Sequence, residues 1–280
     1  MTKRKLVSAF PNDECIKKTG VFRVNAFNER KVAEIFTEEK AKEYELKLDS
    51  LWHELVQAHA SMYVIEKVLN FPADFLLDLG RQTFLHLVLG NFTRQVALAV
   101  INALTDDDPR SLTFTSLKKW IVQNCLPEIR DEVSVYLEGL AIEDEIKSLL
   151  ERAKTLRNKL LAHLDSEYAI DPTRKAEAKI SFVNLQCLVK RTEELLSGLC
   201  FGHRRSMLPV EYSYLVCHPE GVDRRSDIEY ILDLLAADST ILRMPEEQEE
   251  YWPVYAEGLT QEQKKILNKW RRRIGKSEVW

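Results

Sequence analysis

The stretch EDEIKSLLERAKTLRNKLLAHL, residues 143–164, decides the fold class of this chain. Its apolar residues recur every three or four positions, which is the spacing of one face of an α-helix. At about 100° per residue they fall on a single arc. These positions are Ile146, Leu149, Leu150, Ala153, Leu156, Leu160, Leu161 and Leu164. Arg157 lies inside the arc, where a leucine would be expected, and His163 lies at its edge.

An arginine on an apolar arc needs a partner or a use, because an unpaired buried charge is costly. His163 lies about 120° around the helix from Arg157 and roughly 9 Å further along it. With Asn158, the run supplies a fixed cation, an amide and a titratable base within two turns. This set of groups is suited to phosphate chemistry.

The same residues resemble the R-x(4–6)-H motif of HEPN domains, with a gap of five residues and Asn158 as the polar residue after the arginine. The longer string LRNKLLAHLD, residues 156–165, is similar to the U-type abortive-infection branch, and the resemblance covers residues 28–200. It implies a metal-independent endoribonuclease that needs no cofactor. His163 would move a proton between the ribose 2′-OH and the leaving 5′-oxygen, Arg157 would bind the phosphate oxygens, and Asn158 would orient the phosphate or the 2′-OH.

The resemblance further implies a homodimer in which two motifs face each other across a two-fold axis and form a composite active site. It also implies an antiphage-defence effector or a toxin, with RNA as substrate and a cognate antitoxin or regulatory protein as a second partner. The alternative is a non-catalytic helical module that binds RNA or protein. In that case Arg157 would bridge two helices through a carboxylate, and His163 would cap the helix C-terminus.

The bulk composition is that of an ordinary globular protein. Of 280 residues, 45% are hydrophobic and 30% are charged, and the 9 Gly and 9 Pro are too few for a β-sandwich or barrel. The net charge of −4 excludes a uniformly basic nucleic-acid binder but leaves room for a local basic site. The start of the chain lacks the apolar core of a signal peptide, and no uncharged apolar stretch is as long as a membrane span. Five scattered cysteines suit a reducing compartment, so we expect a cytoplasmic protein without membrane contact.

Periodicity, proline positions and capping residues predict an all-α fold, a HEPN-like helical bundle with a mostly helical C-terminal extension. We expect an N-terminal tail over 1–27, the helical domain over 28–200 and the extension over 201–280. The expected helical segments are 28–70, 73–104, 111–126, one opened by Pro127, 143–164, 171–199, 227–237 and 261–274. Thr260 and Gln263 form a capping-box pattern before the last of these, and Gly275 should stop it.

Two further groups are weaker candidates. Cys200, His203, Cys217 and His218 could bind zinc, although their spacing matches no standard zinc finger. Residues 261–280 carry seven basic and two acidic residues, and the candidate RNA contacts among them are Lys264, Lys269, Trp270, Arg271, Arg272 and Arg273. The alternative for this helix is a solvated basic face with Trp270 packed inward. His53, His59 and His86 are expected to be satisfied core or interface histidines.

Overall fold

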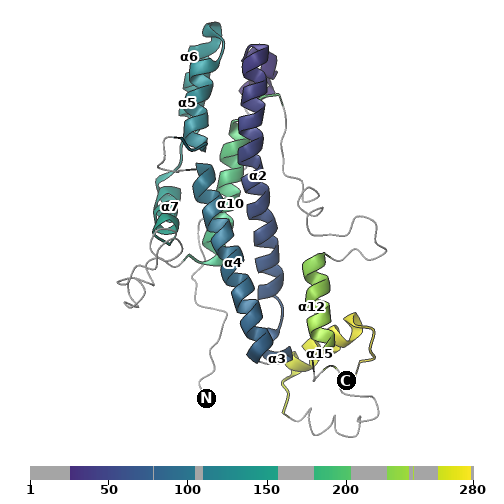
Figure 1. The fold of residues 1–280 in the computed structure, drawn as a ribbon. Helices are drawn as coiled ribbons and strands as arrows, with labels where there is room; N and C mark the ends of the chain where they lie inside the picture. Colours follow the sequence, from purple (N-terminus) through teal and green to yellow (C-terminus); the bar gives the residue numbers. More distant parts are fainter. Residues whose placement is uncertain are drawn as a thin grey trace. The chain divides into compact units, whose positions relative to one another are not determined.

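The structure is a computed structural model that describes residues 26–77, 79–104, 110–156, 180–202, 226–239, 242 and 258–278. Every regular element among these residues is a helix, which confirms the all-α prediction (Figure 1). By their contacts the described residues form two compact units. The first takes residues from 1–59 and 94–206, and the second takes residues from 60–93 and 207–280. This grouping by contacts does not test the expected domain boundaries at residues 27 and 200. Both boundaries remain predictions.

The described elements are α-helices and short 3₁₀ helices. In chain order they are η1 (Ala26–Glu29), η2 (Val32–Glu34), α2 (Glu38–Leu69), α3 (Ala73–Leu76), α4 (Leu79–Leu104), α5 (Phe114–Asn124), η3 (Pro127–Ile129), α6 (Arg130–Glu138), α7 (Asp144–Leu156), α10 (Phe182–Gly198), α12 (Asp227–Ala237) and α15 (Gln261–Arg273). The division between the two units falls within α2 and within α4, so both of these helices contribute residues to each unit.

Three expected helix boundaries were wrong. The segment expected to be helical from residue 28 has two 3₁₀ turns before α2 begins at Glu38. The single helix expected over 73–104 is interrupted, because Leu77 is extended and its carbonyl accepts a hydrogen bond from the Gln82 side chain at 2.8 Å. The helix expected from Asp171 begins instead at Phe182, after Ser181, whose side chain accepts from the backbone N–H of Asn184. Asp171 itself lies outside the described residues.

Two helices in the second unit match their predictions closely. α12 spans the expected residues, and Ser226 and Glu229 form a capping box at its start. α15 begins with the predicted box of Thr260 and Gln263, and Gly275 follows it at a φ of 78°, a left-handed conformation that favours glycine. The expected extended segment at 212–216 and the acidic loop at 245–250 lie outside the described residues.

Each unit has its own apolar core. In the first, the aromatic rings of Phe36 and Tyr44 stack at 4.9 Å, and α4 contributes an apolar face that includes Val96, Val100 and Leu104. In the second, α12 and α15 cover α2, α3 and α4 with a cluster of buried residues. These are Val64, Val68, Phe71, Leu76, Leu77, Leu85, Ile228, Leu232, Ala236, Leu242, Leu267 and Trp270.

Among the described helices, α4 is long and apolar enough over Gly80–Leu104 to cross a membrane by length and composition. From the sequence, only uncharged apolar stretches were considered as membrane spans. This stretch was not among them because it contains Arg81 and Arg94. A core helix of a soluble protein passes the same test, and Val96, Val100 and Leu104 of α4 are buried in the first unit.

Candidate functional site

The motif residues Arg157, Asn158 and His163 lie outside the described residues. The structure does describe the two helices that adjoin them in the chain. α7 ends at Leu156, one residue before Arg157, and α10 begins at Phe182. The helices α7 and α10 therefore flank the candidate site in the sequence, and contacts with other helices hold both of them in place.

Helix α7 is amphipathic in the way the sequence predicts. Ile146, Leu150 and Ala153 are 4%, 1% and 0% exposed, at a spacing of four and then three residues. Glu151 and Arg152, on the opposite side, are exposed. The buried arc is thus confirmed up to Ala153. The sequence-based expectation that Arg157 continues this arc, four residues further on, remains a prediction.

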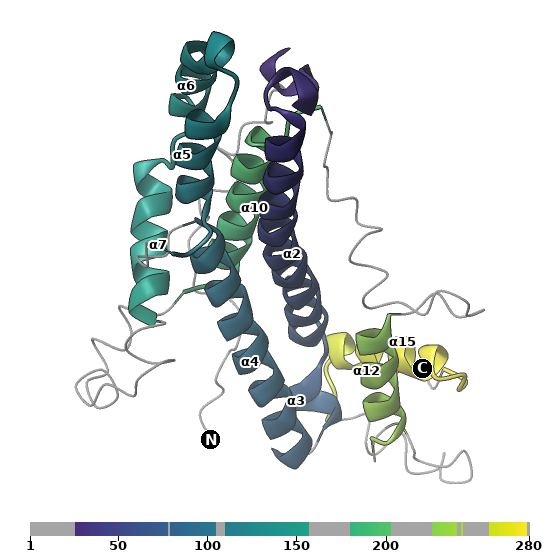
Figure 2. The same ribbon diagram turned by 45° about the horizontal axis from the view of Figure 1, so that its top comes forward.

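Helix α10 packs against α7, and an arginine joins them. Arg191 donates from Nε to Glu143 at 2.9 Å, just before α7 begins, and it is also paired with Glu194 on its own helix. The start of α7 thus lies beside the second half of α10. The end of α7 and the start of α10, which adjoin residues 157–179, lie toward the same end of this unit (Figures 1 and 2).

The other end of α10 is held by a network of buried hydrogen bonds. Asn28 donates to the carbonyls of Gly198 and Cys200 at 3.1 and 3.0 Å, and Tyr136 of α6 donates to Gly198 at 2.6 Å. Tyr44 of α2 donates to Leu199. Burial raises the pKa of Tyr136 to about 12, so this hydroxyl stays a donor at neutral pH. The free carbonyls at the end of α10 are therefore satisfied by three different segments.

A histidine and a carboxylate meet in the same unit. His59 Nε2 lies 3.3 Å from Glu193, which joins α2 to α10. Glu193 lies eleven residues beyond Phe182, about 16 Å along the helix from the end adjoining the motif segment. The pair therefore links two helices, and the prediction of an interface histidine is confirmed for His59. It was wrong for His53 and His86, whose side chains are exposed.

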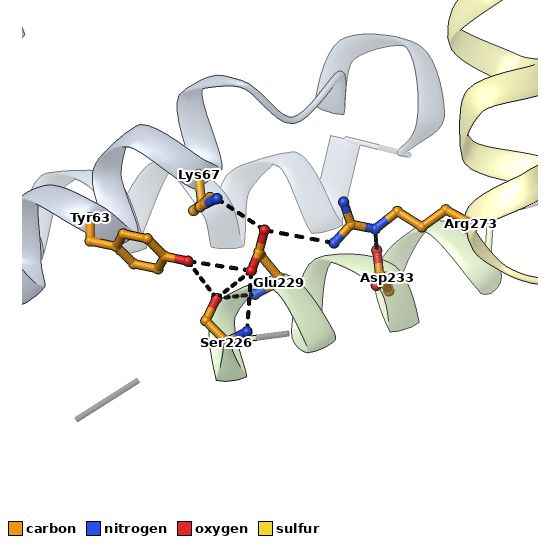
Figure 3. A network of polar contacts seen from close by, with 6 residues as sticks. All are labelled: Tyr63, Lys67, Ser226, Glu229, Asp233 and Arg273. Atoms are coloured by element: carbon orange, nitrogen blue, oxygen red, sulfur yellow. Dashed lines mark hydrogen bonds and ion pairs between the residues drawn. The ribbon is translucent and has the colours of Figure 1, made fainter. Parts of the chain in front are cut away.

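The second unit contains a network of charged groups that Figure 3 shows in detail. Lys67 of α2 donates to Glu229 of α12 at 2.9 Å, and Tyr63 donates to Ser226 at 3.0 Å. Arg273 of α15 pairs with Asp233 of α12 and approaches Glu229 at 4.0 Å. Burial opposes ionisation of Glu229, but hydrogen bonds from Lys67 and Ser226 outweigh it and lower its pKa to about 2. Glu229 is therefore an anion that ties α12 to α2.

The candidate RNA contacts on α15 have different environments. Trp270 is 7% exposed and packs edge-on against Phe71 with ring centroids 5.0 Å apart, so the alternative of an inward tryptophan is the one observed. Arg271 is 1% exposed, and its Nε donates to the Ser277 carbonyl at 2.7 Å. Neither side chain is placed to contact RNA, which corrects the sequence-based assignment for these two residues. Lys264 and Arg273 are half-buried, while Lys269 and Arg272 are exposed.

The cysteine and histidine cluster receives no support from the described residues. Cys200 is buried, and its thiol donates to the Leu196 carbonyl at 3.3 Å, while His203, Cys217 and His218 lie outside the described part. No group of metal-binding side chains occurs where the structure describes the chain. Among the described cysteines, Cys125 and Cys200 are buried free thiols.

The chain was compared with known proteins. Residues 41–215 match the AbiU2 family of HEPN domains, which covers more than half of the chain and includes the whole Arg157–His163 motif. No curated protein and no solved structure matches it. The all-α fold and this match define a HEPN-type helical protein. Within that class, the chain belongs to the AbiU2 family, an abortive-infection family.

Proposed function

We propose that this protein is a metal-independent endoribonuclease that acts through Arg157, Asn158 and His163. The observation that carries the proposal is the AbiU2 match, because it spans the segment in which these three residues occur. The buried arc of α7 gives further support. It is described as far as Ala153, and the expected position of Arg157, four residues further on, would continue the same face.

The chemistry can be written without a metal. The ribose 2′-oxygen forms a bond to the adjacent phosphorus as the bond from phosphorus to the 5′-oxygen breaks. His163 takes the proton from the 2′-OH and returns a proton to the departing 5′-oxygen. Arg157 donates to the non-bridging oxygens as negative charge develops there, and Asn158 orients the phosphate or the 2′-OH. The products are a 2′,3′-cyclic phosphate and a 5′-OH.

A homodimer with a composite site is part of the proposal. On one helix Arg157 and His163 would lie about 120° apart, so groups from two facing motifs complete a site more readily than one motif alone. Light scattering at micromolar concentration should then give a mass near twice the 32.5 kDa of the chain. A dilute monomer that cleaves RNA at the full rate would contradict the composite site.

In the cell, the family's association with abortive infection supports a role as an antiphage effector or toxin. Such an enzyme would act on RNA in the cytoplasm and would be held in check by an antitoxin or regulatory protein, since uncontrolled RNA cleavage harms the host.

The test is cleavage of total RNA in EDTA by the full chain and by His163→Ala. The matched control is His53→Ala, because His53 is an exposed histidine on α2 outside the motif. We expect the wild type and His53→Ala to cleave, and His163→Ala to lose activity while keeping its helical circular dichroism. Equal cleavage by His163→Ala would instead support the non-catalytic module with a structural Arg157 and His163.

A further inference from the structure

Six of the seven cations in residues 261–280 divide into two sets by their environment, and the half-buried Lys264 belongs to neither set. Residues 261–280 carry seven basic and two acidic residues in a chain of net charge −4. Arg271, Arg273 and Lys276 are each engaged within the second unit. Arg271 donates to the Ser277 carbonyl, Arg273 pairs with Asp233, and Lys276 donates to the Leu242 carbonyl at 3.0 Å. These three serve the packing of α15.

The second set forms one exposed row, which we call the α15 basic stripe: Lys265, Lys269 and Arg272. Their spacing of four and three residues places them within about 60° of one another and along about 10 Å of the helix. The Arg272 side chain is 66% exposed and pairs with Glu278. The stripe thus presents three cations on one face, directly opposite the buried Leu267.

The helix dipole explains only part of this arrangement. Cations are favoured in the last turn of a helix, which accounts for Arg272. Lys265 is in the second turn, where the dipole gives a cation no such advantage. The dipole therefore accounts for one of the three cations that share this face.

The chemistry of the row favours a phosphate backbone. None of the exposed large hydrophobic side chains in the described residues lies on α15, so the helix lacks the apolar edge that an interfacial membrane helix inserts. We propose that the α15 basic stripe binds the backbone of single-stranded RNA. The choice of RNA as the ligand rests on the proposed nuclease function.

A distinctive consequence follows from Trp270. The Trp270 ring is buried against Phe71, so α15 itself, among the described residues, offers no exposed aromatic side chain that could stack on a base. Binding at the stripe should therefore depend on phosphates alone. It should be insensitive to base sequence, equal for RNA and DNA single strands, and strongly weakened by salt.

The test uses the full chain in EDTA and a fluorescent single-stranded DNA of mixed sequence, which has no 2′-OH and so resists the proposed cleavage. The stripe variant combines Lys265→Gln, Lys269→Gln and Arg272→Gln. A control variant with the same loss of charge combines Lys42→Gln, Lys119→Gln and Lys147→Gln, three exposed lysines of the first unit. Fluorescence anisotropy over a series of salt concentrations gives the affinity and its salt dependence.

For the stripe variant we expect the slope of log K against log salt to become shallower by about 2, from roughly 0.7 per lost contact, and the low-salt affinity to fall about tenfold or more. The control variant should bind as the wild type does. Binding by the stripe variant equal to that of the control, or no binding by the wild type, would overturn the proposal. Binding of the wild type to phosphatidylserine vesicles but not to the oligonucleotide would also overturn it and would indicate a membrane surface.

The same variants keep this proposal separate from the nuclease function. If His163→Ala still cleaves RNA but the stripe variant fails to bind, the stripe stands and the catalytic assignment fails. If both proposals hold, His163→Ala loses cleavage and the stripe variant loses affinity for the oligonucleotide, so the two results are read from separate measurements.

Discussion

The segment after α7 and helix α15 both carry an arginine where the apolar spacing would suit a leucine. Arg271 follows the buried Leu267 by four residues and is 1% exposed. Its guanidinium donates to the Ser277 carbonyl and fastens the chain after α15. No histidine follows Arg271 before the chain ends, whereas Arg157 is followed by Asn158 and His163. An arginine on an apolar arc therefore indicates only that the guanidinium needs a partner. It is the neighbouring Asn158 amide and His163 imidazole that indicate phosphate chemistry at Arg157.

The largest effect expected from this comparison is on catalysis. Arg157→Ala should reduce cleavage about a hundredfold or more, because the developing phosphate charge loses its donor. Its unfolding free energy should stay close to that of the wild type. Arg271→Ala should show the reverse, with normal cleavage per folded molecule and lower stability. The measurements are the RNA cleavage rate and the urea unfolding free energy of both variants. Equal changes of both quantities in the two variants would contradict the comparison.

The next largest effect concerns the core beneath α15. Trp270→Ala should cost about 3–5 kcal/mol, because it removes a buried aromatic side chain and its edge contact with Phe71. Tyr230→Ala is the control, since this aromatic residue on α12 is 51% exposed. Urea midpoints measure the difference. If both variants are equally stable, Trp270 is not the core residue described above.

A smaller loss is expected when Arg271 itself is removed. Arg271→Ala should destabilise the protein by about 1–3 kcal/mol, because the Ser277 carbonyl loses its donor and the buried aliphatic part of the arginine side chain loses its packing. The neighbouring Arg272→Ala should change stability by less than about 0.5 kcal/mol, as is usual for an exposed side chain. An equal loss of unfolding free energy in Arg271→Ala and Arg272→Ala would mean that the burial of Arg271 does not contribute to stability.

The smallest effect is a pH dependence in the second unit. The pKa of Glu229 is lowered to about 2 from 4.5, so its ion pairs stabilise the fold above pH 4.5 and the stabilisation is lost as the pH falls toward 2. Glu229→Gln should be less stable than the wild type at neutral pH and should approach it near pH 2. The control is Glu262→Gln, an exposed carboxylate of α15, for which the gap should stay near zero at every pH.

Local signals in the sequence were sufficient for much of the fold. The capping box of Thr260 and Gln263 and the stop at Gly275 involve residues only a few positions apart, and both are confirmed. The arc of α7 is confirmed through Ile146, Leu150 and Ala153 for the same reason.

The features that sequence reasoning missed depend on particular side-chain partners, some near in the sequence and some distant. The break at Leu77 is fixed by a side chain from the next helix, and the end of α10 is held by Asn28 and Tyr136, which are 170 and 62 residues from Gly198. On α15, Arg271 donates to the carbonyl of Ser277, which lies beyond the helix end. Periodicity carries no information about such partners. It identified a basic helix correctly but could not say which cations face solvent.

The central claim is that Arg157 and His163 direct the 2′-OH against its neighbouring phosphate. The most direct measurement is mass spectrometry of the ends produced from a defined RNA oligonucleotide in EDTA, alongside the same oligonucleotide with a single 2′-deoxy sugar at the cleavage site. We predict 2′,3′-cyclic phosphate and 5′-OH ends from the first, and an intact 2′-deoxy site in the second. Ends bearing a 5′-phosphate, a requirement for magnesium, or cleavage at the 2′-deoxy position would contradict the claim.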